Sequence, residues 1–93
     1  MIVGSLVVEA TLYEASSLKT KRSVVKSLTT RVKQRCNVSI AETDFQDLWQ
    51  RTQWSLVSVG NERKQVETEL QRALRLIESS SDLEVTKLEW GII

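Results

Sequence analysis

The order in which hydrophobic periodicities follow one another constrains the fold of this chain more than any other feature. Residues 2–13 alternate between an almost wholly apolar set and a mixed set, which predicts a long strand with one buried face. A helical repeat begins after the potential N-cap residues Ser16 and Ser17. A second one covers 62–78 after Asn61, which is predicted to cap it. Further strands are predicted at 37–43, 52–59 and 83–92.

This β-α-β-β-α-β order predicts an α+β fold of the ferredoxin-like type. Two helices would cover one face of a four-stranded antiparallel sheet and leave the other face open. The 93 residues fit a single domain, 1–93. Residues 44–51 predict a connecting loop with one short helical turn. In the last strand the apolar residues change face, so a β-bulge is predicted near Thr86 and Lys87.

The composition excludes several kinds of chemistry. Without histidine, the chain has neither imidazole acid–base catalysis nor imidazole metal ligands. The single cysteine, Cys36, fits a reducing compartment, and it has no histidine to activate it as a nucleophile. The apolar start is too short to span a membrane and lacks the basic region of a signal peptide. We therefore expect a cytoplasmic protein that binds no membrane, is not an enzyme and carries no cofactor.

The charges are distributed very unevenly. No acidic residue occurs between Ala15 and Ala41, a segment that holds seven of the 13 basic residues, whereas the rest of the chain is net −6. Four basic side chains of the first predicted helix share one flank on a helical wheel: Lys19, Arg22, Lys26 and Lys33. Such a stripe is typical of a phosphate-binding surface, although a solvated helix face is the alternative.

Two further basic residues are assigned to this surface. Arg51, in the loop before the third strand, is predicted to join the stripe. Lys21 is included as well, but its wheel position is near the middle of the apolar face. It would either project past the edge of the core or pair with a carboxylate such as Glu42 or Asp44.

The aromatic and apolar residues suggest a second kind of surface. Tryptophans on an open sheet face could stack on bases, but packing in the core or in a subunit interface is the alternative. The candidate protein-interface residues are Val3, Val7, Tyr13, Trp49 and Trp54. The glycine- and aromatic-rich signature of the RNA recognition motif is absent.

The clustered carboxylates Glu42, Asp44 and Asp47 could attract magnesium. Turn capping and pairing with Lys21 or Arg51 explain them better, so no metal site is predicted. The three glycines are scattered and form no phosphate-binding loop.

The combination of SLKTKR (17–22) with NVSIAETDFQDLWQR (37–51) resembles the YlxP-like family of small uncharacterised bacterial proteins, nearly end to end. The resemblance implies the ferredoxin-like fold, no enzymatic activity and no cofactor. It also implies a role near the ribosome, because the genes of this family often lie beside genes for transcription elongation, translation initiation and ribosome maturation.

The leading hypothesis is a non-enzymatic accessory protein associated with ribosomal or other structured RNA, which binds the phosphate backbone through its basic first helix. The alternative is a protein-interaction module whose open sheet face forms a homodimer or binds another factor. A small-ligand sensor is a third option and would require a formed pocket.

Overall fold

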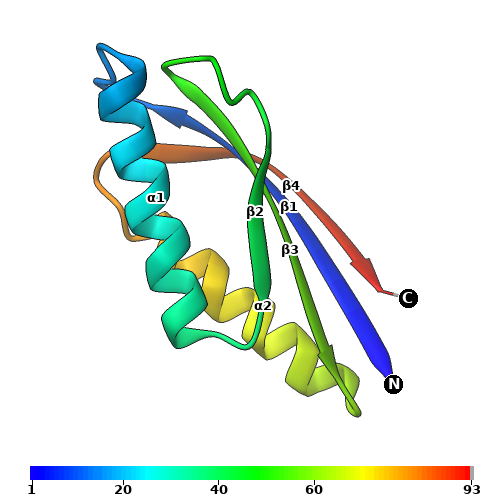
Figure 1. The fold of residues 1–93 in the computed structure, drawn as a ribbon. Helices are drawn as coiled ribbons and strands as arrows, with labels where there is room; N and C mark the ends of the chain where they lie inside the picture. Colours follow the sequence, from blue (N-terminus) through cyan, green and yellow to red (C-terminus); the bar gives the residue numbers. More distant parts are fainter. Residues whose placement is uncertain (93) are drawn as a thin grey trace.

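The computed structural model describes residues 1–92 and confirms the predicted order of elements. The chain runs β1 (Ile2–Leu12), α1 (Leu18–Arg35), β2 (Ser39–Asp44), β3 (Arg51–Gly60), α2 (Arg63–Glu78) and β4 (Leu83–Ile92). The two central strands pair antiparallel with each other and with the edges, in the order β2-β3-β1-β4. This is the ferredoxin-like α+β fold (Figure 1).

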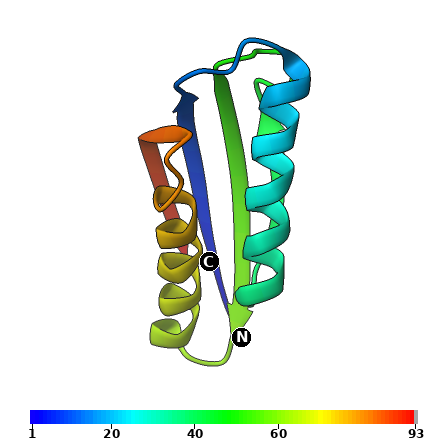
Figure 2. The ribbon, with the colours of Figure 1, turned by 90° about the vertical axis from the view of Figure 1, so that its left-hand side faces the viewer.

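Both helices pack on one face of the sheet and leave the other face uncovered (Figures 1 and 2). α1 covers the side of β2 and β3, and α2 covers β1 and β3 and approaches β4. The start of β1 and the end of β4 lie at the same end of the elongated molecule (Figure 1).

The core forms from the strand side chains that face the helices. In β1 the residues from Leu6 to Leu12 alternate between buried and partly exposed, as the sequence predicts. The fully enclosed side chains Leu6, Val8, Leu56 and Leu70 join β1, β3 and α2. Their alternation fixes the register, because a slip of one residue would turn every core side chain toward solvent.

The bulge predicted near Thr86 and Lys87 is confirmed. Glu9 lies opposite Lys87, and the next residue, Ala10, lies opposite Val85, so Thr86 is the extra residue. The bulge keeps Leu83 and Val85 on the same side as Leu88, Trp90 and Ile92, which face the helices.

Two local predictions need correction. Asn61 does not cap α2; Glu62 occupies the N-cap position, and its side chain makes no capping hydrogen bond. The loop between β2 and β3 has no helical turn. It forms a tight turn in which Phe45 has a positive φ of 61° and the Leu48 amide donates to the Phe45 carbonyl.

Candidate nucleic-acid interface

The position of α1 determines which of its basic side chains reach solvent. Ser17 is the N-cap, and its hydroxyl accepts a hydrogen bond from the Thr20 amide at 3.1 Å. Val25, Leu28 and Val32 are buried against the sheet and α2, which directs the remaining sides of the helix outward. Basic residues in the last turn, Lys33 and Arg35, complement the partial negative charge of the helix C-terminus.

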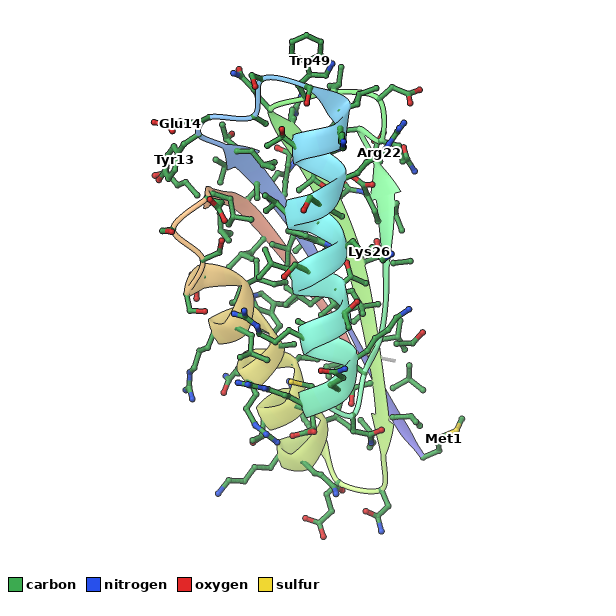
Figure 3. All side chains as sticks on the ribbon, turned by 60° about the vertical axis from the view of Figure 1, so that its left-hand side comes forward. Met1, Tyr13, Glu14, Arg22, Lys26 and Trp49 are labelled. Atoms are coloured by element: carbon green, nitrogen blue, oxygen red, sulfur yellow. The ribbon has the colours of Figure 1, made fainter. Side chains whose placement is uncertain are left out.

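The predicted stripe exists as an exposed surface, which we call the α1 basic flank. Its members are Lys19, Arg22, Lys26 and Lys33, and all four are exposed. At about 1.5 Å per residue, this flank is about 21 Å long. The labelled Arg22 and Lys26 project from the same edge of the helix (Figure 3).

The α1 basic flank is almost free of carboxylates. Arg22 has one ion-pair contact, with Asp47 at 3.9 Å, and both side chains are largely exposed. Among residues 1–92, no carboxylate lies within 4 Å of the ammonium groups of Lys19, Lys26 or Lys33. Their charges are therefore available to an external anion.

Lys21 does not belong to this surface, and its assignment as a phosphate contact was wrong. The side chain is completely buried. Its ammonium group donates to the carbonyls of Phe45 at 2.7 Å and Gln46 at 3.0 Å and lies 2.8 Å from Oε2 of Glu42. Of the two alternatives, pairing with a carboxylate is correct, and the partner is Glu42. All three ammonium hydrogens have acceptors, so this cation cannot reach a ligand.

The Lys21 ammonium instead organises the turn between β2 and β3. Glu42 also accepts a hydrogen bond from the buried hydroxyl of Thr52 at 2.6 Å, so one carboxylate connects α1, β2 and β3. The two carbonyls that Lys21 binds belong to the turn that begins with Phe45 in the left-handed region. A buried and fully satisfied cation of this kind holds the loop in one position.

Arg51 does not join the α1 basic flank either. It lies opposite Thr11 on the uncovered face of the sheet. There its guanidinium pairs with Glu9 at 3.1 Å and stacks over the Phe45 ring, 4.0 Å from its centroid. Arg51 therefore faces away from α1, on the opposite side of the sheet from the α1 basic flank.

The candidate protein-interface residues are dispersed in the structure. Val3 and Val7 lie partly exposed on the uncovered sheet face, as predicted. Tyr13 and Trp49 are about half exposed, but they lie in the segments after β1 and β2, near one end of the molecule (Figure 3). Trp54 is a correction: it is fully buried, and its indole donates to the Thr29 hydroxyl at 3.0 Å.

Two further valines on the uncovered face were not assigned to the interface. Val57 is 44% exposed and Val59 is 50% exposed, and Val59 lies directly opposite Val3. The alternation of β3 was sufficient to find them, because Trp54 and Leu56 occupy the other parity.

Within the part of the chain that the structure describes, the cysteine and the acidic residues outside the α1 basic flank show no arrangement suited to catalysis or metal binding. Burial raises the pKa of the Cys36 thiol, which keeps it in its less reactive protonated form. Asp44 caps the tight turn by accepting from the Phe45 amide. Residues 1–92 contain no cluster of three or more cysteines and carboxylates that could hold a metal ion, and none of their helices is both long and apolar enough to cross a membrane.

A solved structure with the same fold is the "De novo designed protein Foldit4". It is 14% identical to this chain, with a TM-score of 0.56 over 100% of this chain and 97% of that one. This similarity concerns the fold alone.

Sequence comparison identifies the family. A family model described as "Protein of unknown function (DUF503)" matches residues 3–90. The "Uncharacterized protein YlxP" of Bacillus subtilis (strain 168) is 44% identical over 91 residues, which cover 96% of this chain and 99% of that protein. The chain therefore belongs to the DUF503 family of YlxP-like proteins, as its SLKTKR and DLWQR segments indicated.

Proposed function

We propose that this protein is a non-enzymatic, cytosolic RNA-binding accessory protein, and that its RNA is ribosomal or similarly structured. The α1 basic flank would contact phosphates, so recognition would depend on charge and shape rather than on base edges. The observation that carries the proposal is that Lys19, Lys26 and Lys33 are exposed and have no carboxylate partner among residues 1–92.

The comparison with α2 supports this interpretation. Acidic neighbours three or four residues away stabilise cations on a helix surface, as Glu67 does for Arg63 and Glu69 for Arg72 in α2. α1 has no acidic residue at all. Its cations repel one another, and an RNA backbone would relieve that repulsion while releasing counterions.

Trp49 extends the proposed surface at one end of the helix. Asp47, two residues before it, contacts Arg22, so the turn that carries Trp49 lies beside the first part of the flank. The indole is 51% exposed at the end of the molecule (Figure 3). In this proposal it would stack on an unpaired base while the flank contacts the adjoining phosphates.

The test is the salt dependence of binding to purified ribosomal subunits and to protein-free ribosomal RNA. Four phosphate contacts predict a slope of about −3 in a plot of log K against log salt concentration. Replacing Lys26 and Lys33 by glutamate should reduce that slope by about half and weaken binding at least about tenfold at moderate salt.

A matched control is the double variant Lys64→Glu/Arg75→Glu. It changes the net charge by the same amount, but its two sites are exposed positions on α2. The proposal predicts that this control binds clearly more tightly than the Lys26→Glu/Lys33→Glu variant. Equal binding by the two variants, or binding of the native chain that does not respond to salt, contradicts it.

A second candidate function is a protein-interaction module, favoured by the valines of the uncovered sheet face. Val3, Val57 and Val59 form an exposed apolar group, which a second copy or another protein factor could cover. If this is the main function, Val57→Lys/Val59→Lys should abolish partner binding and leave RNA binding intact.

A further inference from the structure

The outer edge of β4 differs from that of β2, the other edge of the sheet. β2 is short, shifts register between Glu42 and Asp44, and has its helix-facing side covered through Ile40 and the Lys21–Glu42 pair. β4 is longer, and beyond the bulge it pairs regularly with β1 from Lys87 to Ile92. Among residues 1–92, β4 has no neighbouring strand on its outer side. A long and regular edge of this kind is a template for another strand.

The same part of β4 carries an exposed apolar row. Leu88, Trp90 and Ile92 all face the helix layer, and they are 39%, 47% and 42% exposed. They remain exposed because α2 packs mainly over β1 and β3 and reaches only part of β4. Trp90 and Ile92, together with Leu70 of α2, line an open groove of about 440 Å³ between the helix and the edge strand.

The charges on the opposite side of β4 suggest what covers this edge. Lys87 and Glu89 face the uncovered side of the sheet, on either side of Leu88. If two copies of β4 pair antiparallel about a two-fold axis at Leu88, each Lys87 lies opposite Glu89 of the second copy. A two-fold axis at Lys87 or at Glu89 would instead place like charges opposite each other, which disfavours pairing.

This register also joins the apolar rows. Leu88 of one copy lies opposite Leu88 of the other, and each Trp90 is a diagonal neighbour of Leu88 across the pair. The two β1 strands are then three strand spacings apart, about 14 Å. Helices in direct contact are only about 8–10 Å apart, so the two α2 helices leave room between them for these side chains.

We propose that β4 is a self-association edge, at which two copies of this chain pair antiparallel about Leu88 to form a continuous eight-stranded sheet. The two-fold axis is perpendicular to the sheet, so both helix layers lie on the same side and the two α1 basic flanks lie at its outer margins. This inference does not depend on the proposed RNA-binding function.

The test uses sedimentation velocity of the native chain and of two charge-reversed variants. The native chain should dimerise at micromolar to high-micromolar concentrations. Lys87→Glu and Glu89→Lys, each alone, place like charges opposite each other twice per dimer and should weaken association by about tenfold or more. An equimolar mixture of the two variants restores both attractive pairs, so it should associate about as well as the native chain.

The mixing experiment guards against a folding defect, because a misfolded variant would not be rescued by its complement. Val57→Lys, on the uncovered sheet face, serves as the control and should leave dimerisation unchanged. A native chain that is monomeric at high-micromolar concentration overturns the proposal. So does a dimer that Val57→Lys disrupts, or one that the β4 reversals leave intact.

Discussion

The two helices lie side by side on the same face of the sheet, but different interactions hold them there. α2 is packed closely on β1 at Gly4. A methyl group at Gly4 would lie 2.6 Å from Val66 Cγ1 and 3.0 Å from Leu70 Cδ1, so only a hydrogen fits beneath the helix. Apolar contact attaches α2 to the sheet, and the ion pairs of its side chains join neighbours on the same helix.

α1 has an apolar contact face as well, but two polar contacts with the strands and with the turn between β2 and β3 fix its orientation. Lys21 reaches Glu42 and the turn between β2 and β3, and Thr29 accepts the indole hydrogen of buried Trp54. Apolar packing has little directional preference, whereas these hydrogen bonds require defined geometry. The polar contacts therefore set the rotation of α1 about its axis, and with it the direction in which the α1 basic flank points.

Replacing Lys21 by methionine removes the main polar contact of α1 and should have the largest effect on stability. Glu42 and two backbone carbonyls would lose their cation in a buried site, which should lower the free energy of unfolding by about 3–5 kcal/mol. Urea unfolding of the native and variant proteins measures the difference.

Lys26→Met is the matched control, because Lys26 is an exposed lysine of the same helix without an ion pair among residues 1–92. Its effect should stay within about 0.5 kcal/mol. The double variant Lys21→Met/Glu42→Leu should recover part of the loss, since it removes both buried charges together. If Lys21→Met is no more destabilising than Lys26→Met, the buried ion pair does not anchor α1.

Lys21 also marks the limit of what the sequence could predict. The alternation of β1 and the helical repeats determine the order of elements, and the parity change in β4 correctly predicts the bulge at Thr86. The wheel position of Lys21 shows that it faces inward. Whether Lys21 pairs with Glu42 or with Asp44 depends on which residues of β2 face the helices. The register shift after Glu42 determines which residues these are.

The candidate surface was predictable to a similar degree. Lys19, Arg22, Lys26 and Lys33 follow from helical geometry alone, because a helix of known span has fixed directions for its side chains. Arg51 was misplaced because strand parity, rather than closeness in sequence to the loop, puts it on the other side of the sheet. Trp54 shows that bulk alone does not identify an interface: its indole hydrogen finds an acceptor, Thr29, inside the protein.

The corresponding test for α2 is Gly4→Ala. The added methyl group overlaps Val66, so α2 must move or Val66 must change rotamer, at a cost of about 1–3 kcal/mol. Thermal and urea unfolding measure it. Gly60→Ala is the control: there the nearest atoms would be 3.2 Å away, and the cost should be smaller. If the two substitutions have equal effects, close packing at Gly4 is not the feature that positions α2 on the sheet.

Thr29→Val tests the second polar contact of α1 at nearly constant volume. The buried indole of Trp54 loses its acceptor, which should cost about 1–3 kcal/mol, and the lower end is expected because water can reach the half-buried Thr29. Trp54 fluorescence should also respond to the lost hydrogen bond. Thr30→Val, at the adjacent exposed position, should have little effect on either measurement, and a similar loss there would assign the effect to helix propensity instead.

The smallest expected effect concerns Glu69, where the two helices are tied together. Its carboxylate accepts from the Asn37 amide, just beyond α1, at 2.8 Å, and pairs with Arg72, which also donates to the Arg35 carbonyl. The Asn37 hydrogen bond, followed by Arg72, lowers the pKa of Glu69 below its usual value of 4.5.

Because the lowered pKa means that the folded protein favours the ionised carboxylate, this stabilisation is present above pH 4.5 and is lost as the pH falls through the folded-state pKa. Glu69→Gln should therefore lower stability by less than about 1 kcal/mol at neutral pH, as expected for a solvent-screened pair. The difference from the native chain should disappear in acid, where both side chains are neutral. Urea unfolding at a series of pH values measures this convergence. A difference that persists unchanged in acid would mean that the shape of the side chain, rather than its charge, ties α2 to the end of α1.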